Sequence, residues 1–179
     1  MLKIEKVENV ELSRMFERKY DAERLRLGSE DAVNHQRCYH LSSAGWGTLC
    51  ETGLDVKQAK PGLFGRALYF SPDAQKCDGY WRKATGGDAG AVAVASTGHD
   101  PSTTRVMFAC RVLLGQTYEF APSQTCKGMT KPPDGHESVS GLIRGDREVA
   151  VYENERALLE YMITYQVRKQ AYPQIQMPP

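Results

Sequence analysis

The sequence predicts an α+β fold built around a mainly antiparallel β-sheet. Segments with helical periodicity come mostly early in the chain, whereas β-rich runs come mostly late. The chain has no internal repeat and no regular alternation of strands with helices, so a Rossmann fold is not expected. A length of 179 residues is enough to bury a core in one domain without cross-links.

The second ten residues predict an amphipathic surface helix. Apolar side chains recur there at helical spacing, and charged side chains fill the other side. The apolar set is Leu12, Met15, Phe16 and Tyr20. A second, short helix is expected to begin near Trp46, with Gly53 as its C-terminal cap.

A short β-type run, "RALYF", is predicted to lead directly into a helix. It spans residues 66–70 and contains Tyr69. Ser71 follows as the expected N-cap, and Pro72 as the first helical residue, a position that tolerates proline. We therefore expect Tyr69 on a strand that ends where a helix begins.

Three more strands are expected in the second half of the chain. Residues 105–115 form an almost continuous apolar run, which is typical of a strand buried on both faces. Residues 148–152 and 160–167 contain β-branched residues or alternate in polarity. Residues 85–104 and 121–147 are rich in glycine, proline or small polar residues and predict loops.

Charge and hydropathy exclude several classes of protein. Twenty-three basic and twenty-two acidic side chains give a net charge of +1, so no overall field favours nucleic acid or an anionic membrane. The apolar runs are too short to span a membrane, and the N-terminus is too charged for a signal peptide. We expect an intracellular protein, cytoplasmic or nuclear, with one domain over residues 1–171 and a frayed tail over 172–179.

The five cysteines predict neither disulfides nor a structural zinc site. Their number is odd and no CxxC spacing occurs, so we interpret them as reduced thiols. Cys38 and His40 invite a catalytic dyad, but Cys38 is expected on the other side of a loop and no thiol has the surroundings of a nucleophile. A zinc site through Cys38, His40 and Cys50 lacks a fourth ligand.

Two tyrosines predict a slot for a flat heterocycle. Tyr80 follows Tyr69 by eleven residues, with a short helix between them, so the chain can fold back and bring the two rings face to face. Cys77 would lie at the edge of this slot. Tyrosines at such positions are more often part of the core or its rim, so the spacing alone leaves this open.

Four ordered segments together resemble the catalytic domain of the poly(ADP-ribose) polymerase family, the diphtheria-toxin-like ADP-ribosyltransferases. The segments are "YHLS" (39–42), "FGRALYF…C..Y" (64–80), "PPDGHESVSG" (132–141) and "REVAVYENERALLEYMITYQV" (147–167). The N-terminal "IEKVENVELSRMFERKY" also resembles the helix that opens this domain. The resemblance implies a split, mainly antiparallel β-sandwich with flanking helices and an NAD cleft.

The resemblance also implies the site residues. The His-Tyr-Glu triad of the family would be His40, Tyr69 and Glu148, acting on NAD as co-substrate without a metal. NAD would be bound by His40, Leu41, Ser42, Tyr69, Phe70, Cys77 and Tyr80. His40 would contact the adenosine ribose, the two tyrosines would enclose nicotinamide, and Glu148 would hold the nicotinamide ribose.

Three positions depart from the family pattern. Leu41 stands where the family has a glycine that binds the nicotinamide amide, Ala67 replaces another glycine, and Cys77 replaces a serine. A leucine is compatible only if the position needs neither a positive φ nor a close approach. Cysteine is a weaker hydrogen-bonding group than serine, so we expect a reshaped or weaker nicotinamide pocket.

The implied activity is transfer of ADP-ribose from NAD to a protein acceptor, as single units or short chains, with release of nicotinamide. Automodification is one expected outcome. The alternatives are a weak or inactive module that binds NAD or ADP-ribose, and an NAD glycohydrolase. Nucleic-acid acceptors have no support from a basic stretch with interleaved aromatic residues, and no membrane partner is expected.

Overall fold

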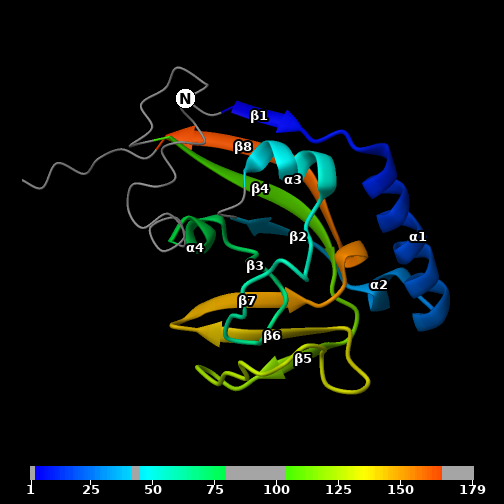
Figure 1. Cartoon of the computed structure of the whole chain (residues 1–179). Helices are drawn as coiled ribbons and strands as arrows, with labels where there is room; N and C mark the ends of the chain where they lie inside the picture. The colour runs from blue at the N-terminus through cyan, green and yellow to red at the C-terminus, as the bar shows by residue number, and fades with distance from the viewer. Residues whose placement is uncertain (1–2, 42–44, 80–103, 167–179) are drawn as a thin grey trace, which may run out of the picture.

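The computed structural model describes residues 3–41, 45–79 and 104–166. Two four-stranded sheets form the framework (Figure 1). The first sheet has the order β1-β8-β4-β2, formed by Lys3–Lys6, Ala157–Gln166, Thr104–Leu113 and His35–His40. The second has the order β3-β7-β6-β5, formed by Leu68–Phe70, Asp146–Val151, Ser138–Ile143 and Thr117–Phe120.

Strand pairing is antiparallel throughout both sheets except between β5 and β6, which are parallel. The α+β prediction with a mainly antiparallel sheet is therefore confirmed, with the sheet divided into two. β4 is the strand predicted from the apolar run and lies in the middle of the first sheet, between β8 and β2. β7 and β8 confirm the two strands predicted near the end of the chain.

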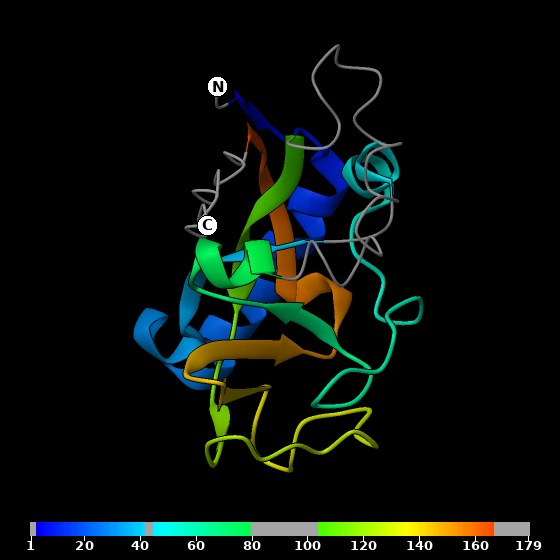
Figure 2. The same cartoon turned by 90° about the vertical axis from the view of Figure 1, so that its left-hand side faces the viewer.

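Helices flank the two sheets (Figures 1 and 2). They are α1 (Val10–Leu27), α2 (Glu30–Val33), α3 (Trp46–Thr52), α4 (Ala74–Gly79) and the 3₁₀ helix η2 (Asn154–Arg156). α1 is longer than the predicted ten residues. Its N-cap is Asn9, whose side chain accepts a hydrogen bond from the Leu12 N–H, and it ends at Gly28 in the left-handed conformation. α3 agrees with its prediction, including Gly53 as C-cap.

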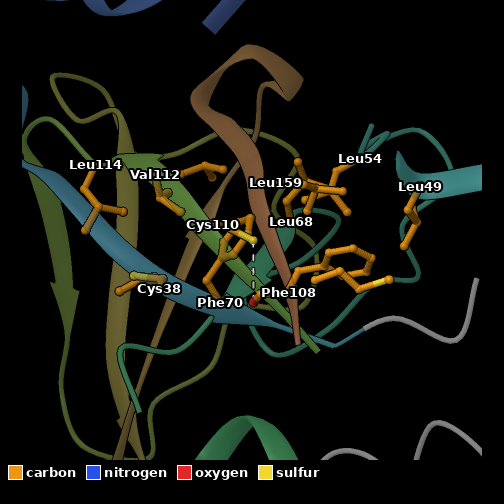
Figure 3. Close-up of a cluster of buried hydrophobic side chains, with 13 residues drawn as sticks. Cys38, Leu49, Leu54, Leu68, Phe70, Phe108, Cys110, Val112, Leu114 and Leu159 are labelled. Atoms are coloured by element: carbon orange, nitrogen blue, oxygen red, sulfur yellow. Dashed lines mark hydrogen bonds between the residues drawn. The ribbon is translucent and has the colours of Figure 1, made fainter. Parts of the chain in front are cut away.

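The largest core cluster lies where the two sheets face each other (Figure 3). It combines residues of β2, β4 and β8 with residues of β3 and β7. The members are Cys38, Leu49, Leu54, Leu68, Phe70, Phe108, Cys110, Val112, Leu114, Val149, Val151, Leu159 and Met162. Burial of this apolar surface supplies the main driving force for holding the sheets together.

A main-chain bridge joins the two sheets at the end of β2. The Tyr39 N–H donates to the Ser71 carbonyl at 2.7 Å, and the Ser71 N–H donates back to the Tyr39 carbonyl at 3.1 Å. The Ser71 hydroxyl also donates to the Arg147 carbonyl at 2.9 Å, which ties the bridge to β7. The ends of β2, β3 and β7 are thereby fixed next to one another.

Three local predictions need correction. The N-cap of α4 is Asp73, whose carboxylate accepts from the Gln75 N–H at 2.7 Å, and Pro72 lies outside the helix. The Ser71 hydroxyl accepts from the Asp73 N–H at 3.1 Å, before the helix begins at Ala74. β6 and the start of β7 lie inside the segment 121–147 that the sequence predicted as loop. Small residues such as Ser140 and Gly141 have low β propensity, so the sequence did not indicate a strand there. In the fold both are buried, because β6 lies between β7 and β5. Of the loop predicted over 85–104, Thr104 is the first residue of β4, and residues 85–103 lie outside the described residues, as does the 172–179 tail.

A buried ion-pair network attaches α1 to the rest of the fold. Arg156 on η2 donates to Glu23 at 2.9 Å, and both side chains are more than nine-tenths buried. Lys19 contributes a further ion pair to Glu23, at 3.3 Å, and Arg26 another at 2.5 Å. Burial opposes ionisation of Glu23, but these cations together keep its pKa below the ordinary value.

Removing the Arg156 guanidinium is expected to destabilise the fold, because Glu23 would keep a buried carboxylate with one cation fewer. We expect Arg156→Met to lower the free energy of unfolding by about 3 kcal/mol, as measured by urea denaturation. The matched control is Arg14→Met, whose ion pair with Glu11 is exposed and contributes less than about 1 kcal/mol. Equal losses in the two variants would contradict the prediction.

Candidate functional site

The three residues predicted as catalytic come from three strands that meet at the junction of the sheets. His40 is the last residue of β2, Tyr69 lies on β3 and Glu148 lies on β7. β3 pairs with β7 so that Tyr69 faces Ala150, which puts Tyr69 and Glu148 on the same face of the second sheet. His40, from the first sheet, contacts β3 through a hydrogen bond to the Tyr69 carbonyl.

His40 is fixed by a hydrogen bond between its Nδ1 and the Tyr69 carbonyl, 2.8 Å long. Because a carbonyl oxygen only accepts, Nδ1 carries the proton and Nε2 keeps its lone pair in the neutral ring. Burial lowers the pKa of His40, although the bond to Tyr69 acts in the opposite direction. The ring packs against that of Phe70, with 5.3 Å between ring centroids. His40 is thus a neutral, oriented acceptor.

Tyr69 is held by both hydrogen-bonding functions of its hydroxyl. The hydroxyl donates to the Gly65 carbonyl at 2.7 Å and accepts from the Phe64 N–H at 2.8 Å. Burial, with the nearby charge of Glu148, raises the pKa of Tyr69 to about 12, so the phenol stays neutral. A Cβ at Gly62 would come within 2.7 Å of the Tyr69 ring, so that glycine gives the ring its space. The Tyr69 ring is therefore held in one position. Its hydroxyl is hydrogen-bonded to the loop that contains Phe64 and Gly65.

Glu148 is a buried carboxylate paired with a lysine from α4. Only 4 % of the residue is exposed, and its Oε1 lies 3.1 Å from the Lys76 Nζ. Lys76 also donates to the Ile143 carbonyl at 3.1 Å and lies 3.6 Å from Asp146. No motif in the sequence predicts Lys76 as a site residue. It is the only basic residue between Tyr69 and Tyr80, which is the signal that could have indicated it.

Four other predicted residues have different placements. Leu41 follows β2 directly, and its φ is not positive, so the backbone there accepts a side chain. Phe70 is buried in the core, where it supports the His40 ring. Ser42 and Tyr80 lie outside the described residues.

Cys77 is buried on α4, next to Lys76. Its main-chain N–H donates to the Asp73 carbonyl at 3.1 Å, within the helix. Burial raises the pKa of its thiol to about 12, with a smaller contribution from Asp78. A neutral thiol at this position is a weak donor. Ala67, by contrast, is buried in a second cluster with Phe64 and needs no glycine conformation.

The cysteines supply no nucleophile for His40. Cys38 lies two residues before His40 on the same strand, so the expectation of a loop between them is wrong. Burial raises the pKa of the Cys38 thiol to about 11, which keeps it protonated and unreactive. All five cysteines are free thiols, as predicted.

The site contains no obvious metal centre within the described ranges. Among those residues, no three His, Cys, Asp or Glu side chains are grouped so that they could hold an ion. Among the same residues, no helix has the length and apolar character needed to cross a membrane. What the site offers is a buried carboxylate, a neutral imidazole and a fixed aromatic ring. Such a set can bind hydroxyl groups and stabilise a developing positive charge.

One family comparison matches most of the chain. The model of the poly(ADP-ribose) polymerase catalytic domain matches residues 1–148. The matched region contains His40 and Tyr69 and ends at Glu148, so it includes all three residues that converge at the sheet junction.

The His40 ring is expected to titrate below its ordinary pKa of 6.5, because burial disfavours the charged form. The unfolded chain then binds more protons in acid, so the stability due to the neutral ring is lost as pH falls from 6.5 towards the folded-state pKa. An NMR titration of the labelled imidazole, assigned with His40→Gln, measures the midpoint. A midpoint at or above 6.5 would contradict this prediction.

Proposed function

Because the chain belongs to the poly(ADP-ribose) polymerase catalytic-domain family, we propose that it transfers ADP-ribose from NAD to a protein acceptor and releases nicotinamide. The observation that chiefly supports the proposal is that His40 of the first sheet is hydrogen-bonded to Tyr69 of the second, and Tyr69 shares a sheet face with the almost fully buried Glu148. Members of this family use NAD as a substrate.

His40 is proposed to hold the adenosine half of NAD. With Nδ1 donating to the Tyr69 carbonyl, Nε2 can accept a hydrogen bond from a ribose hydroxyl. Ser42, two residues along, is proposed as its neighbour in this contact. The same bond to Tyr69 couples the position of the adenosine ribose to that of the nicotinamide wall.

Tyr69 is proposed as one wall of the nicotinamide slot and Tyr80 as the other. The main chain of Leu41 would bind the carboxamide, and its ordinary φ supports this in spite of the glycine-to-leucine change. Cys77 would face the same carboxamide as a weaker substitute for serine. Phe70 contributes by supporting His40 from the core.

Glu148 is proposed to act on the nicotinamide ribose. Its carboxylate would accept a hydrogen bond from the 2′-hydroxyl and stabilise the positive charge that develops at the anomeric carbon. The bond between that carbon and the nicotinamide nitrogen breaks, and its electron pair leaves with nicotinamide. The acceptor nucleophile then bonds to the same carbon and gives its proton to solvent water. Lys76, 3.1 Å from Oε1, would orient the carboxylate for this role.

Single transfers or short chains are proposed as products. β6 and β7 are joined by a turn of only two residues, Arg144 and Gly145, with φ of 57° and 90°. This tight turn beside Asp146 leaves little loop surface with which to hold a growing chain. Five free cysteines favour a reducing compartment, so we place this activity inside the cell.

The second candidate function is an inactive NAD-binding module. The properties of Cys77 favour it. Its buried, neutral thiol cannot grip a carboxamide as a hydroxyl does. Under this alternative the protein binds NAD and releases no nicotinamide. Hydrolysis to free ADP-ribose, with water as the acceptor, is a third outcome of the same assay.

Glu148→Gln is expected to reduce nicotinamide release by about 100-fold or more, because it removes the charge that stabilises the transition state. Incubation with ADP-ribose-labelled NAD, followed by mass spectrometry of the protein and the small molecules, measures transfer, product length and hydrolysis together. Glu119→Gln, on the exposed edge strand β5, is the matched control and should retain full activity. Absence of label transfer from wild-type protein would reject the transferase proposal.

Cys77→Ser is expected to strengthen nicotinamide binding, since a hydroxyl is the better hydrogen-bonding group. We expect the KM for NAD to fall about threefold, a change of less than 1 kcal/mol in binding. Cys110→Ser, at another buried thiol of the core, controls for the cost of burying a hydroxyl. An unchanged or higher KM in Cys77→Ser would show that this thiol does not face the carboxamide.

A further inference from the structure

α4 is held to the two sheets by different charged side chains. Lys76 connects it to the second sheet through Glu148 and the Ile143 carbonyl. Asp78, two residues further on, connects it to the first sheet. Figure 1 shows α4 beside β2, at the level where the two sheets meet. The helix therefore spans the junction on which the candidate site is built.

The Asp78 carboxylate receives two donors from the first sheet. Arg105 on β4 places its Nη1 2.6 Å from each carboxylate oxygen, and the Tyr165 hydroxyl on β8 donates to Oδ1 at 2.5 Å. Arg105 and Tyr165 are direct partners across β4 and β8, so both side chains project from the same face. Burial raises the pKa of Tyr165, as does its bond to Asp78, so it remains a donor. The pairing of β4 with β8 thus places both donors where they can bind the Asp78 carboxylate.

α4 depends on such contacts for its orientation. It has only six residues, and a helix of this length has little stability of its own. Cys77 lies between the two anchoring residues and is 3 % exposed. Loss of the Asp78 contacts would remove the charged attachment of the helix to the first sheet, so Lys76 and Cys77 would be held less firmly in one position.

We infer that Asp78, Arg105 and Tyr165 are positioning residues for the nicotinamide half of the NAD site. This inference rests on the function proposed above. The three side chains act through α4: they hold Cys77 at the carboxamide and Lys76 against Glu148. The side chains of Arg105 and Asp78 are only 14 % and 29 % exposed, so removing either one also destabilises the fold, and stability has to be measured apart from binding.

The test compares Asp78→Ala, Arg105→Met and Tyr165→Phe with the wild type. Isothermal titration with benzamide, a planar carboxamide like nicotinamide, gives Kd, and nicotinamide release gives KM and kcat. We expect Asp78→Ala and Arg105→Met to raise Kd and KM by about tenfold, below the ~100-fold that a 1 Å misplacement can cost. Tyr165→Phe should have a smaller effect in the same direction.

Three controls separate positioning from general stability. Arg111→Met removes another ion pair of β4, with Glu17, and should leave Kd and KM unchanged. Arg105→Lys keeps the charge and should recover part of the affinity lost in Arg105→Met. The double variant Asp78→Ala/Arg105→Met should lose no more affinity than Asp78→Ala alone, because each single change already removes the same Arg105–Asp78 contact. Thermal unfolding of each variant reports stability separately.

The outcomes distinguish this inference from the proposed function. Wild-type protein that neither binds benzamide nor releases nicotinamide would overturn both. Wild-type protein that does both, while Asp78→Ala and Tyr165→Phe keep its Kd and KM, would overturn the positioning inference and leave the proposed function standing. Tyr165→Phe removes a single oxygen atom, so this comparison does not depend on a variant that fails to fold.

Discussion

The two main-chain hydrogen bonds between Tyr39 and Ser71 are the constraint on which the site depends. They connect the last residues of β2 to the segment that follows β3, and so fix the first sheet to the second at one point. Through this bridge His40 reaches the Tyr69 carbonyl, and β3 in turn aligns Tyr69 with β7. Because the bridge uses backbone atoms, it tolerates changes in neighbouring side chains.

Ion pairs with little exposure connect two helices to neighbouring elements. Arg156 and Glu23 join η2 to α1, whereas Lys76 and Glu148 join α4 to β7. The apolar core between the sheets supplies most of the stability. Buried ion pairs are costly to desolvate, so we interpret their role here as fixing the orientation and position of α1 and α4.

The three departures from the family pattern differ in their physical consequences. Leu41 occupies backbone that any residue can adopt, and Ala67 packs into a buried cluster, so both are compatible with an intact fold at the site. Cys77 is different, because its side chain would itself contact the substrate. Of the three substitutions, it alone replaces a good hydrogen-bonding group by a weak one.

The sequence by itself determined the fold class, the first helix, the strand–helix boundary after Tyr69 and the three long or β-branched strands, because these depend on local periodicity. It also indicated His40, Tyr69 and Glu148 through the resemblance of four ordered segments. The family resemblance also implied the division into two sheets, whereas only the tertiary structure decided the strand β6 and the partners of Lys76 and Asp78. Glu148 lies 72 positions after Lys76 and Tyr165 lies 87 positions after Asp78, so no local pattern encodes these contacts.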